Sequence, residues 1–324
     1  MNRNTLQSLE PRRHFAADVS ISAIDIEPII LAPGQAVQAT YTIANTGDAA
    51  TGKPSLVRSV LSRDKIFGNA DDVNLGTSSY NPSIAAGASA QLQITRATGL
   101  SFEPGVYRLG AFVDSGDFII ESNETNNATI TAKAVVQIAS PLTGDSLAGT
   151  DGDDRIGVFE RLGKVFVTLN GQAFWRNLGN LQGLSINAGA GNDRVIAEED
   201  FPVNLAVTGA GGNDTIVGGA GNDELSGANG RDFVTGGRGN DYLLGGAGND
   251  RLFGESGRDT LSGAGGNDRL AGGAGFDKLF GGAGNDRLIT NDTDQDRADT
   301  VSGNAGTDTL EGDASDVVAG VEVR

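Results

Sequence analysis

Between residues 209 and 289 the chain repeats every nine residues without an insertion or a deletion. Glycine stands at positions 1 and 4 of all nine copies, aspartate at position 6, and Ile, Val or Leu at position 8. A period this strict indicates units that cannot bury a core alone and that stack on their neighbours, as in solenoid proteins.

Each position of the repeat has a physical task. We expect the glycines at positions 1 and 4 to allow positive φ and close backbone approach in a six-residue turn. Residues 7 to 9 are too few for a helix but enough for a short strand, with the position-8 side chain pointing inward. Two repeats would then make one coil of two strands and two turns, and successive coils would stack at about 4.8 Å.

Such a coil lacks an ordinary core, because it buries few aliphatic side chains against a large loss of backbone entropy. Its stacked position-6 carboxylates also repel each other, and a divalent cation between them would reverse that repulsion. The turns offer carboxylate and carbonyl oxygens on a flexible backbone, the chain has no cysteine, and such donors suit calcium better than magnesium. The pattern therefore predicts calcium as the missing source of stability, although a Gly- and Asp-rich linker without structure is the alternative.

The repeat "GGAGNDRLF" and its neighbours resemble the GGxGxDxUx repeat of RTX, or haemolysin-type calcium-binding, proteins. The resemblance is tight over residues 209–289 and looser over 144–318, and it implies a parallel β-roll. In that family, calcium lies between neighbouring turns, bound by position-6 carboxylates and backbone carbonyls. Carried over to this chain, the metal ligands of one edge would be Asp214, Asp232, Asp250, Asp268 and Asp286, those of the other edge would be Asp223, Asp241, Asp259 and Asp277, and degenerate copies would add Asp154, Asp193 and Asp308.

Some copies depart from the pattern. Arg258 and Phe276 replace the usual Asn or Asp at position 5, and Glu255 replaces a small residue at position 2. We expect position 5 to face outward, so these changes should not abolish binding. After residue 289 the period breaks at "TNDTDQDRADTV", where alternating acidic residues either add an ion site or repel each other: Asp292, Asp294 and Asp296.

Residues 18–137 show short β-prone runs bounded by Pro, Gly, Asn or Asp, which predicts an antiparallel β-sandwich of about seven strands. The runs "YTIANTGDAATG" and "VDSGDFIIESNETNNATI" resemble the CARDB family of immunoglobulin-like bacterial extracellular domains. The resemblance suggests an adhesion module for a cell-surface or polysaccharide ligand. In the loop "SRDKIFGNADDVNLG" a solvated structure is favoured over a cation site, which would use Asp64, Asn69, Asp71 and Asp72.

The remaining segments complete the domain plan. Residues 1–17 form a tail in which "LQSLEPRRHFAA" resembles an LEPR-type export segment, with a disordered basic tail as the alternative. Residues 138–208 contain degenerate repeats and an inserted hairpin that turns at Asn170-Gly171. Residues 209–324 form the roll and its C-terminal cap. The hairpin aromatic and aliphatic side chains would cap the roll: Phe166, Leu169, Phe174 and Trp175. The predicted fold is all-β, with an N-terminal immunoglobulin-like β-sandwich followed by a C-terminal parallel β-roll.

Charge and composition exclude several functions. The net charge of −18 opposes binding to nucleic acid, and no apolar run is long enough for membrane insertion. The sole histidine is His14, so an H-E-x-x-H zinc site is excluded, and Ser146 of a "GDSL" motif has no histidine after it to act as its base.

The sequence therefore predicts a non-enzymatic, secreted or cell-surface calcium-binding structural protein. The alternative is a non-catalytic accessory component of an extracellular enzyme or haemolysin-type toxin system.

Overall fold

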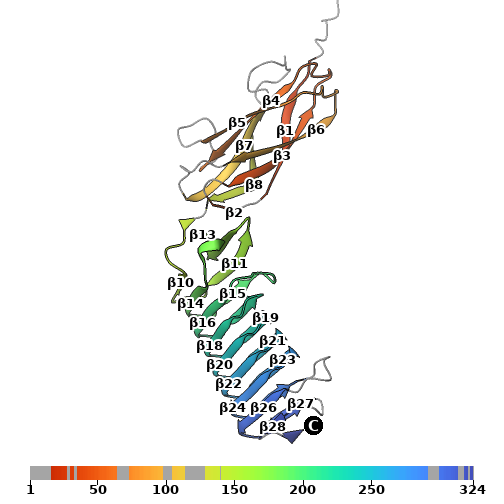
Figure 1. Cartoon of the computed structure of the whole chain (residues 1–324). Helices are drawn as coiled ribbons and strands as arrows, with labels where there is room; N and C mark the ends of the chain where they lie inside the picture. Colours follow the sequence, from red (N-terminus) through yellow and green to blue (C-terminus); the bar gives the residue numbers. More distant parts are fainter. Residues whose placement is uncertain are drawn as a thin grey trace, which may run out of the picture. The chain divides into compact units, whose positions relative to one another are not determined.

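The computed structural model describes residues 16–27, 30–32, 35–63, 73–97, 104–113, 128–138, 140–290, 299–312, 317–319 and 322–323. The chain divides into two compact units, Met1–Ala139 and Ser140–Arg324. The described residues of both units are almost entirely β-strands (Figure 1), interrupted by one 3-10 helix, η1 (Leu178–Asn180). The all-β prediction is therefore confirmed.

The first unit is a sandwich of two sheets, with strand orders β1-β3-β6 and β2-β8-β7-β4-β5 among its described residues. Apart from the short parallel pair of β2 and β8, neighbouring strands are antiparallel. The strands are β1 (Val19–Glu27), β2 (Ile30–Leu31), β3 (Ala36–Asn45), β4 (Ser55–Ser62), β5 (Val73–Tyr80), β6 (Ser89–Ala97), β7 (Gly105–Val113) and β8 (Ala128–Ile138).

The sandwich core follows the period-two pattern of its strands. In β3 every second residue is buried, and the Tyr41 ring is fully buried between the sheets. The Tyr41 hydroxyl and Ser59 Oγ of β4, in the other sheet, are hydrogen-bonded at 2.9 Å, so the buried hydroxyl is satisfied. The predicted sandwich is confirmed. Two of its strands were not predicted: β5, an edge strand with a largely polar sequence, and the two-residue β2.

The second unit is a two-sheet parallel roll, which confirms the predicted β-roll. One sheet has the order β10-β14-β16-β18-β20-β22-β24-β26-β28, and the other runs β29-β27-β25-β23-β21-β19-β17-β15-β11-β12-β13-β9. The strands of the first sheet are β10 (Ser146–Thr150), β14 (Leu184–Ala190), β16 (Leu205–Gly211), β18 (Glu224–Asn229), β20 (Tyr242–Ala247), β22 (Thr260–Gly265), β24 (Lys278–Ala283), β26 (Thr300–Ala305) and β28 (Val317–Ala319). Those of the second are β9 (Ser140–Pro141), β11 (Arg155–Arg161), β12 (Lys164–Leu169), β13 (Gln172–Asn177), β15 (Arg194–Ala197), β17 (Thr215–Gly219), β19 (Phe233–Arg238), β21 (Arg251–Gly257), β23 (Arg269–Gly275), β25 (Arg287–Ile289), β27 (Thr309–Glu311) and β29 (Glu322–Val323).

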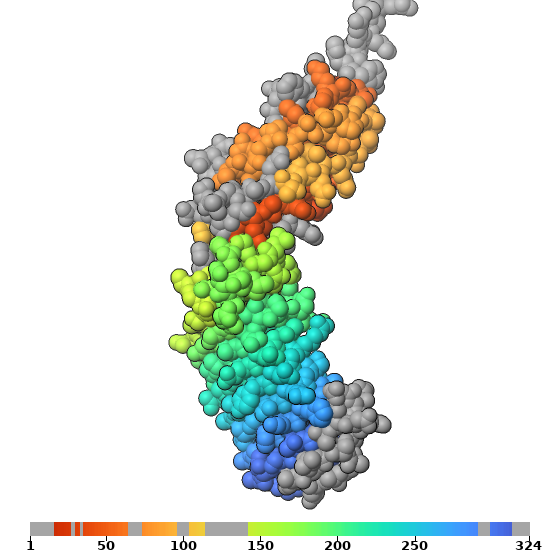
Figure 2. All heavy atoms as spheres, in the orientation of Figure 1, coloured from red at the N-terminus to blue at the C-terminus, as the bar shows by residue number. Residues whose placement is uncertain are grey.

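Successive strands of each sheet pair in register at a spacing of 18 residues through the regular repeats, so two repeats make one coil, as predicted. The position-8 side chains form a fully buried column between the sheets, from Ile216 to Leu288. Figure 2 shows the coils as one continuous stack in which the colour changes steadily from green to blue along the chain. Each coil therefore packs on its sequence neighbours, as a solenoid requires.

The strands are longer than the repeat predicts, because most of them continue from position 7 through position 3 of the next copy, as β18 does. The turn is correspondingly shorter and occupies positions 4 to 6. Positive φ occurs at position 2, as in Glu255 (76°), and at position 4, as in Gly212 (129°), whereas the position-1 glycines of the regular copies do not have it. The expected role of positive φ at position 1 is therefore wrong, and close approach alone requires that glycine.

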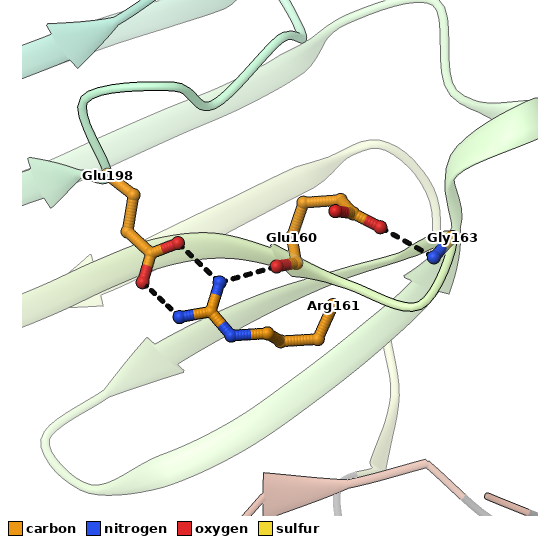
Figure 3. A network of polar contacts seen from close by, with 4 residues as sticks. All are labelled: Glu160, Arg161, Gly163 and Glu198. Carbon is orange, nitrogen blue, oxygen red and sulfur yellow. Dashed lines mark hydrogen bonds and ion pairs between the residues drawn. The ribbon is translucent and has the colours of Figure 1, made fainter. Parts of the chain in front are cut away.

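The hairpin of β12 and β13 turns at Asn170 and Gly171, whose φ values of 50° and 85° suit the predicted type I′ turn. The two strands extend the second sheet beyond β11 in antiparallel register, and the Phe166 ring of β12 is buried. The side chain of Arg161 donates two 2.5 Å hydrogen bonds to the Glu198 carboxylate, which fixes the β11–β12 turn to the segment after β15 (Figure 3).

Candidate metal centre: two ladders of buried aspartates

The position-6 aspartates form two hydrogen-bonded ladders along the roll. In each step the Oδ1 atom accepts a hydrogen bond from the backbone N–H of the aspartate one coil earlier, as in the 2.8 Å bond from Asp214 to Asp232. The first ladder contains Asp154, Asp193, Asp214, Asp232, Asp250, Asp268, Asp286 and Asp308. The second contains Asp223, Asp241, Asp259, Asp277 and Asp299.

These ladders contain all twelve position-6 aspartates predicted as metal ligands, and they add Asp299. This residue was missed because the period breaks before it, and the sequence analysis considered the preceding alternating aspartates instead. A signal was available, since Asp299, Val301 and Gly303 reproduce positions 6, 8 and 1 of the repeat. Its Oδ1 atom accepts a 2.8 Å hydrogen bond from the N–H of Asp277.

The second carboxylate oxygen gives the ladders their chemical character. All the ladder side chains are at most 3% exposed. Among the described residues, the buried Oδ2 atom has no hydrogen-bond partner in Asp193, Asp214, Asp223, Asp232, Asp241, Asp250, Asp259, Asp268, Asp286 and Asp308. An unpaired buried carboxylate oxygen is costly, so a row of them indicates a missing cationic partner.

The position-1 glycine makes room for this oxygen. A Cβ atom on Gly209 would lie 2.1 Å from Oδ2 of Asp214 and 2.9 Å from the carbonyl oxygen of Gly227, one coil further on. The same arrangement recurs at Gly245, whose Cβ would lie 2.5 Å from Oδ2 of Asp250. Position 1 is therefore a small cradle lined by a carboxylate oxygen and a main-chain carbonyl oxygen, which a methyl group would fill.

Position 4 permits the coils themselves to approach. A Cβ atom on Gly212 would lie 1.7 Å from the carbonyl oxygen of Gly191 in the preceding coil. The backbone N–H of Gly212 donates a 3.0 Å hydrogen bond to the carbonyl of Asn229 in the following coil. Glycine at this position is thus needed both for its positive φ and for backbone contact.

Burial changes the acidity of the ladder carboxyls. Desolvation is the main cause and raises their pKa values, while the backbone hydrogen bond to Oδ1 acts in the opposite direction. The pKa is raised to about 6 in Asp214, Asp232, Asp241 and Asp268, and to about 7 in Asp223 and Asp259. These carboxyls therefore titrate near neutral pH when no cation is present.

Asp154, at the start of the first ladder, is different. Burial alone would raise its pKa, but hydrogen bonds from the Thr150 backbone, the Asn170 side chain and the Thr150 hydroxyl together lower it. Both of its oxygens already have donors, including Thr150 N–H and Asn170 Nδ2 at 2.5 Å. This environment suits a residue that ends the ladder.

A further ladder, which sequence reasoning missed, runs along the exposed position-5 residues. The N–H of Asn222 donates a 2.9 Å hydrogen bond to Oδ1 of Asn204, and Asn240 repeats the contact one coil later. Position 5 is exposed, as expected. The row reaches Arg258, whose N–H donates a 2.9 Å hydrogen bond to Oδ1 of Asn240. The Arg258 side chain has no amide oxygen to continue it, and its guanidinium lies 5.3 Å from the centre of the Phe276 ring.

The donors fit calcium better than a transition metal. Among the described residues, no group of three or more His, Cys, Asp or Glu side chains could hold a metal ion. An ion in the cradles would therefore need main-chain carbonyls beside the carboxylates, and oxygen-only donors on an adaptable backbone are typical of calcium sites. Calcium bound there would supply positive charge to oxygens that otherwise have no donor.

Other sequence candidates are placed as follows. Ser146 begins β10 and lies in parallel register with Ser185 of β14, so it belongs to a strand of the roll. Two proposed acidic groups lie outside the described residues: Asp64, Asn69, Asp71 and Asp72 in one, and Asp292, Asp294 and Asp296 in the other.

Family comparisons agree with the two parts of the fold. The RTX calcium-binding nonapeptide repeat model matches residues 185–200, four overlapping stretches that span 208–294, and residues 295–316. The CARDB model matches residues 16–131. The chain contains a CARDB domain and RTX repeats. The expected LEPR-type segment is not supported, and no curated protein matches the chain.

Solved structures give only low similarity scores. The CARDB domain of a Pyrococcus furiosus protein in complex with di-metal ions is 18% identical, with a TM-score of 0.28, and the match covers 38% of this chain and 94% of that one. A putative cell surface protein domain from Methanosarcina acetivorans is 20% identical, with a TM-score of 0.28, covering 38% of this chain and 92% of that one.

The RTX repeats and the CARDB domain together support a calcium-binding structural protein of the cell surface or the extracellular space. Both families are non-catalytic structural domains. Within the described parts of the chain, no helix is long and apolar enough to span a membrane.

Proposed function

We propose that this protein is a secreted or surface module whose roll folds when calcium binds, with the ladder aspartates and neighbouring main-chain carbonyls as ligands. The observation that carries the proposal is the row of buried Oδ2 atoms without donors, which lie beside glycine cradles in the regular repeats. Without a cation, these oxygens must be protonated or left unpaired in the interior.

The proposal also explains the division of labour within a repeat. The position-8 column supplies a narrow apolar interior, and the Oδ1 atoms hold successive turns together through backbone N–H groups. Each Oδ2 atom then needs an external partner. Binding energy that exists only in the folded state becomes folding energy, so calcium would stabilise the roll by mass action.

The test is amide hydrogen exchange of the full chain, followed by mass spectrometry of peptides from residues 209–289. With chelator, these peptides should exchange rapidly, and millimolar calcium should protect them by at least about a hundredfold. Magnesium at the same concentration should protect them much less, because it demands a tighter octahedral site. Equal protection in chelator and in calcium would contradict the proposal.

A matched pair of variants tests the ligands. Asp250→Asn keeps the size of the side chain but removes its charge, whereas Glu224→Gln removes the charge of an exposed carboxylate outside the ladders. We expect Asp250→Asn to raise the calcium concentration needed for half protection, and Glu224→Gln to leave it nearly unchanged. An equal shift in both variants would argue against a ligand role for the carboxylate.

We propose that the chain consists of a tail (1–17), a sandwich (18–137), a transitional segment (138–208) and a roll (209–324). For the sandwich, which is the CARDB domain, we propose a role in adhesion. The family match over residues 16–131 supports this assignment. Binding of the full chain to bacterial cells, compared with a chain in which the sandwich core is disrupted by Tyr41→Ala, would test it. Equal cell binding by both chains would contradict it.

A further inference from the structure

A column of arginines lies on the outer face of one sheet of the roll. In this sheet the position-7 residues of successive strands are register partners, in the order Arg155, Arg194, Thr215, Phe233, Arg251, Arg269, Arg287 and Thr309. We call the five arginines of this row the arginine column. All five side chains are exposed.

The other sheet has no such column, although its strands come from alternate copies of the same repeat. Its equivalent row is Ser185, Ala206, Glu224, Tyr242, Thr260, Lys278 and Thr300. The choice of arginine is therefore specific to one face and is no general property of position 7.

The arginine column is costly for an isolated protein. Neighbouring strands lie about 4.8 Å apart, and like charges directly opposite each other on a sheet destabilise it. The chain has 42 acidic and 24 basic residues, so acidic partners are abundant. Yet from Arg155 to Thr309 none of the row's residues is acidic, and the row reaches a carboxylate only at its end, where Glu322 of β29 is the register partner of Thr309.

Three described arginines elsewhere on the roll pair with carboxylates, namely Arg161, Arg176 and Arg238, whereas Arg231 and Arg258 do not. Figure 3 shows Arg161 paired with both oxygens of Glu198, and Arg238 contacts Glu199 at 2.8 Å. Within the column, Arg287 contacts Glu311 at 2.7 Å. Among the described residues, no ion pair is formed by the other four: Arg155, Arg194, Arg251 and Arg269.

Aromatic rings lie beside the charges. Phe233 stands in the same row and is 38% exposed, and its ring centre is 5.2 Å from that of Phe253. The guanidinium of Arg269 lies 5.8 Å from the centre of the Phe253 ring. The face thus combines unpaired cations with an apolar ring surface, on a rigid strand ladder.

We propose that the arginine column binds a linear anionic polysaccharide whose carboxylate groups pair with successive guanidinium groups. A planar guanidinium matches a carboxylate with two parallel hydrogen bonds, and an exposed ring offers a flat apolar surface to the face of a sugar. A polysaccharide is favoured because the basic surface is only one residue wide and so fits a single linear chain of carboxylates. The protein around it is acidic, with a net charge of −18. A nucleic acid duplex carries a denser charge and would meet repulsion from the rest of the protein.

This proposal rests on the proposed function, because the column exists only when the roll is folded. The probe is a short soluble galacturonate oligomer, titrated calorimetrically into the full chain in calcium at about 0.15 M salt. A neutral glucose oligomer of the same length is the control ligand. We expect binding of the galacturonate alone, and the affinity should fall as salt rises.

The variant R251Q/R269Q should lower the affinity at least about tenfold, because charge-assisted hydrogen bonds are lost. R251K/R269K should retain an intermediate affinity, since lysine keeps the charge without the planar fork. The matched control R258Q/K278Q removes the same charge outside the column and should change the affinity by less than about twofold.

Equal losses in R251Q/R269Q and R258Q/K278Q would overturn the proposal, as would equal binding of the neutral oligomer or tighter binding of a DNA oligonucleotide.

Hydrogen exchange on the same samples separates the two proposals. A calcium-protected roll that does not bind galacturonate overturns the column and leaves the proposed function standing. A roll that calcium does not protect overturns the proposed function, while arginine-dependent binding would still support the column.

Discussion

The sandwich and the roll are both all-β, but they fill their interiors differently. Between the sheets of the sandwich lie large side chains from many strands, including Tyr41, Ile43, Leu61 and Leu109, and the buried Tyr41 hydroxyl is satisfied within the protein. Each regular repeat of the roll buries one aliphatic side chain and one aspartate. Under the proposed function, the roll would need calcium from solution to complete its interior, whereas the sandwich would not.

The largest expected effect that separates the two regions is removal of calcium. In chelator, the sandwich peptides 36–45 and 55–62 should keep their slow exchange, because their core is internal, whereas peptides 209–289 should lose theirs. Hydrogen exchange of the full chain measures both regions in one sample. Loss of protection in both regions together would show that the sandwich shares the dependence on calcium.

A methyl group in the cradle should have the next largest effect. Gly245→Ala would place a carbon 2.5 Å from Oδ2 of Asp250 and 2.9 Å from the carbonyl oxygen of Gly263. We expect a loss of about 1–3 kcal/mol in the stability of the calcium-loaded roll, measured by denaturant unfolding. The control is Gly211→Ala, where a Cβ atom meets nothing within 4 Å and the φ angle is not positive. Equal destabilisation by both changes would show that the loss of stability does not come from filling the cradle.

Lowering the pH should partly replace calcium in stabilising the folded roll. The ladder carboxyls have pKa values raised by burial from 3.8 to about 6 in Asp214 and about 7 in Asp223. The folded roll therefore binds protons more tightly than the unfolded chain, so protonation of these carboxyls stabilises the fold. This stabilisation is fully present below pH 3.8 and is lost as the pH rises through 6 and 7.

In chelator, lowering the pH from about 7.5 to about 5 should increase the protection of peptides 209–289, whereas calcium binding should weaken over the same range because protons compete for the carboxylates. Circular dichroism and calcium titrations at each pH check the two halves of this prediction. Protection that falls on acidification would give the opposite sign and refute it.

The smallest effect should come from the sandwich hydroxyl. Tyr41→Phe removes the donor or acceptor that contacts Ser59 and leaves the ring in place, so we expect a loss of about 1 kcal/mol from the sandwich. The thermal midpoint of the sandwich should fall, and the calcium concentration that folds the roll should not change. A shift in calcium dependence would indicate coupling between the regions.

Local sequence determined the roll more completely than it determined the sandwich. The strict period placed Leu225 and Leu243 in the apolar column and Asp214 and Asp232 on a shared ladder, because a solenoid converts sequence spacing directly into stacking. In the sandwich, partners are far apart in sequence, and β5 escaped prediction because an edge strand needs few apolar residues.

Within the site, sequence determined which residues carry the charge, and tertiary structure decided what surrounds each oxygen. The ladder bond from one aspartate N–H to the next Oδ1, the cradle at Gly209 and the saturated carboxylate of Asp154 all depend on coil-to-coil contacts. Asp299 joined its ladder across a break in the period. The arginine column likewise depended on strand register, because the spacing between coils is irregular in the degenerate copies, where Arg155 pairs with Arg194 and Arg194 with Thr215.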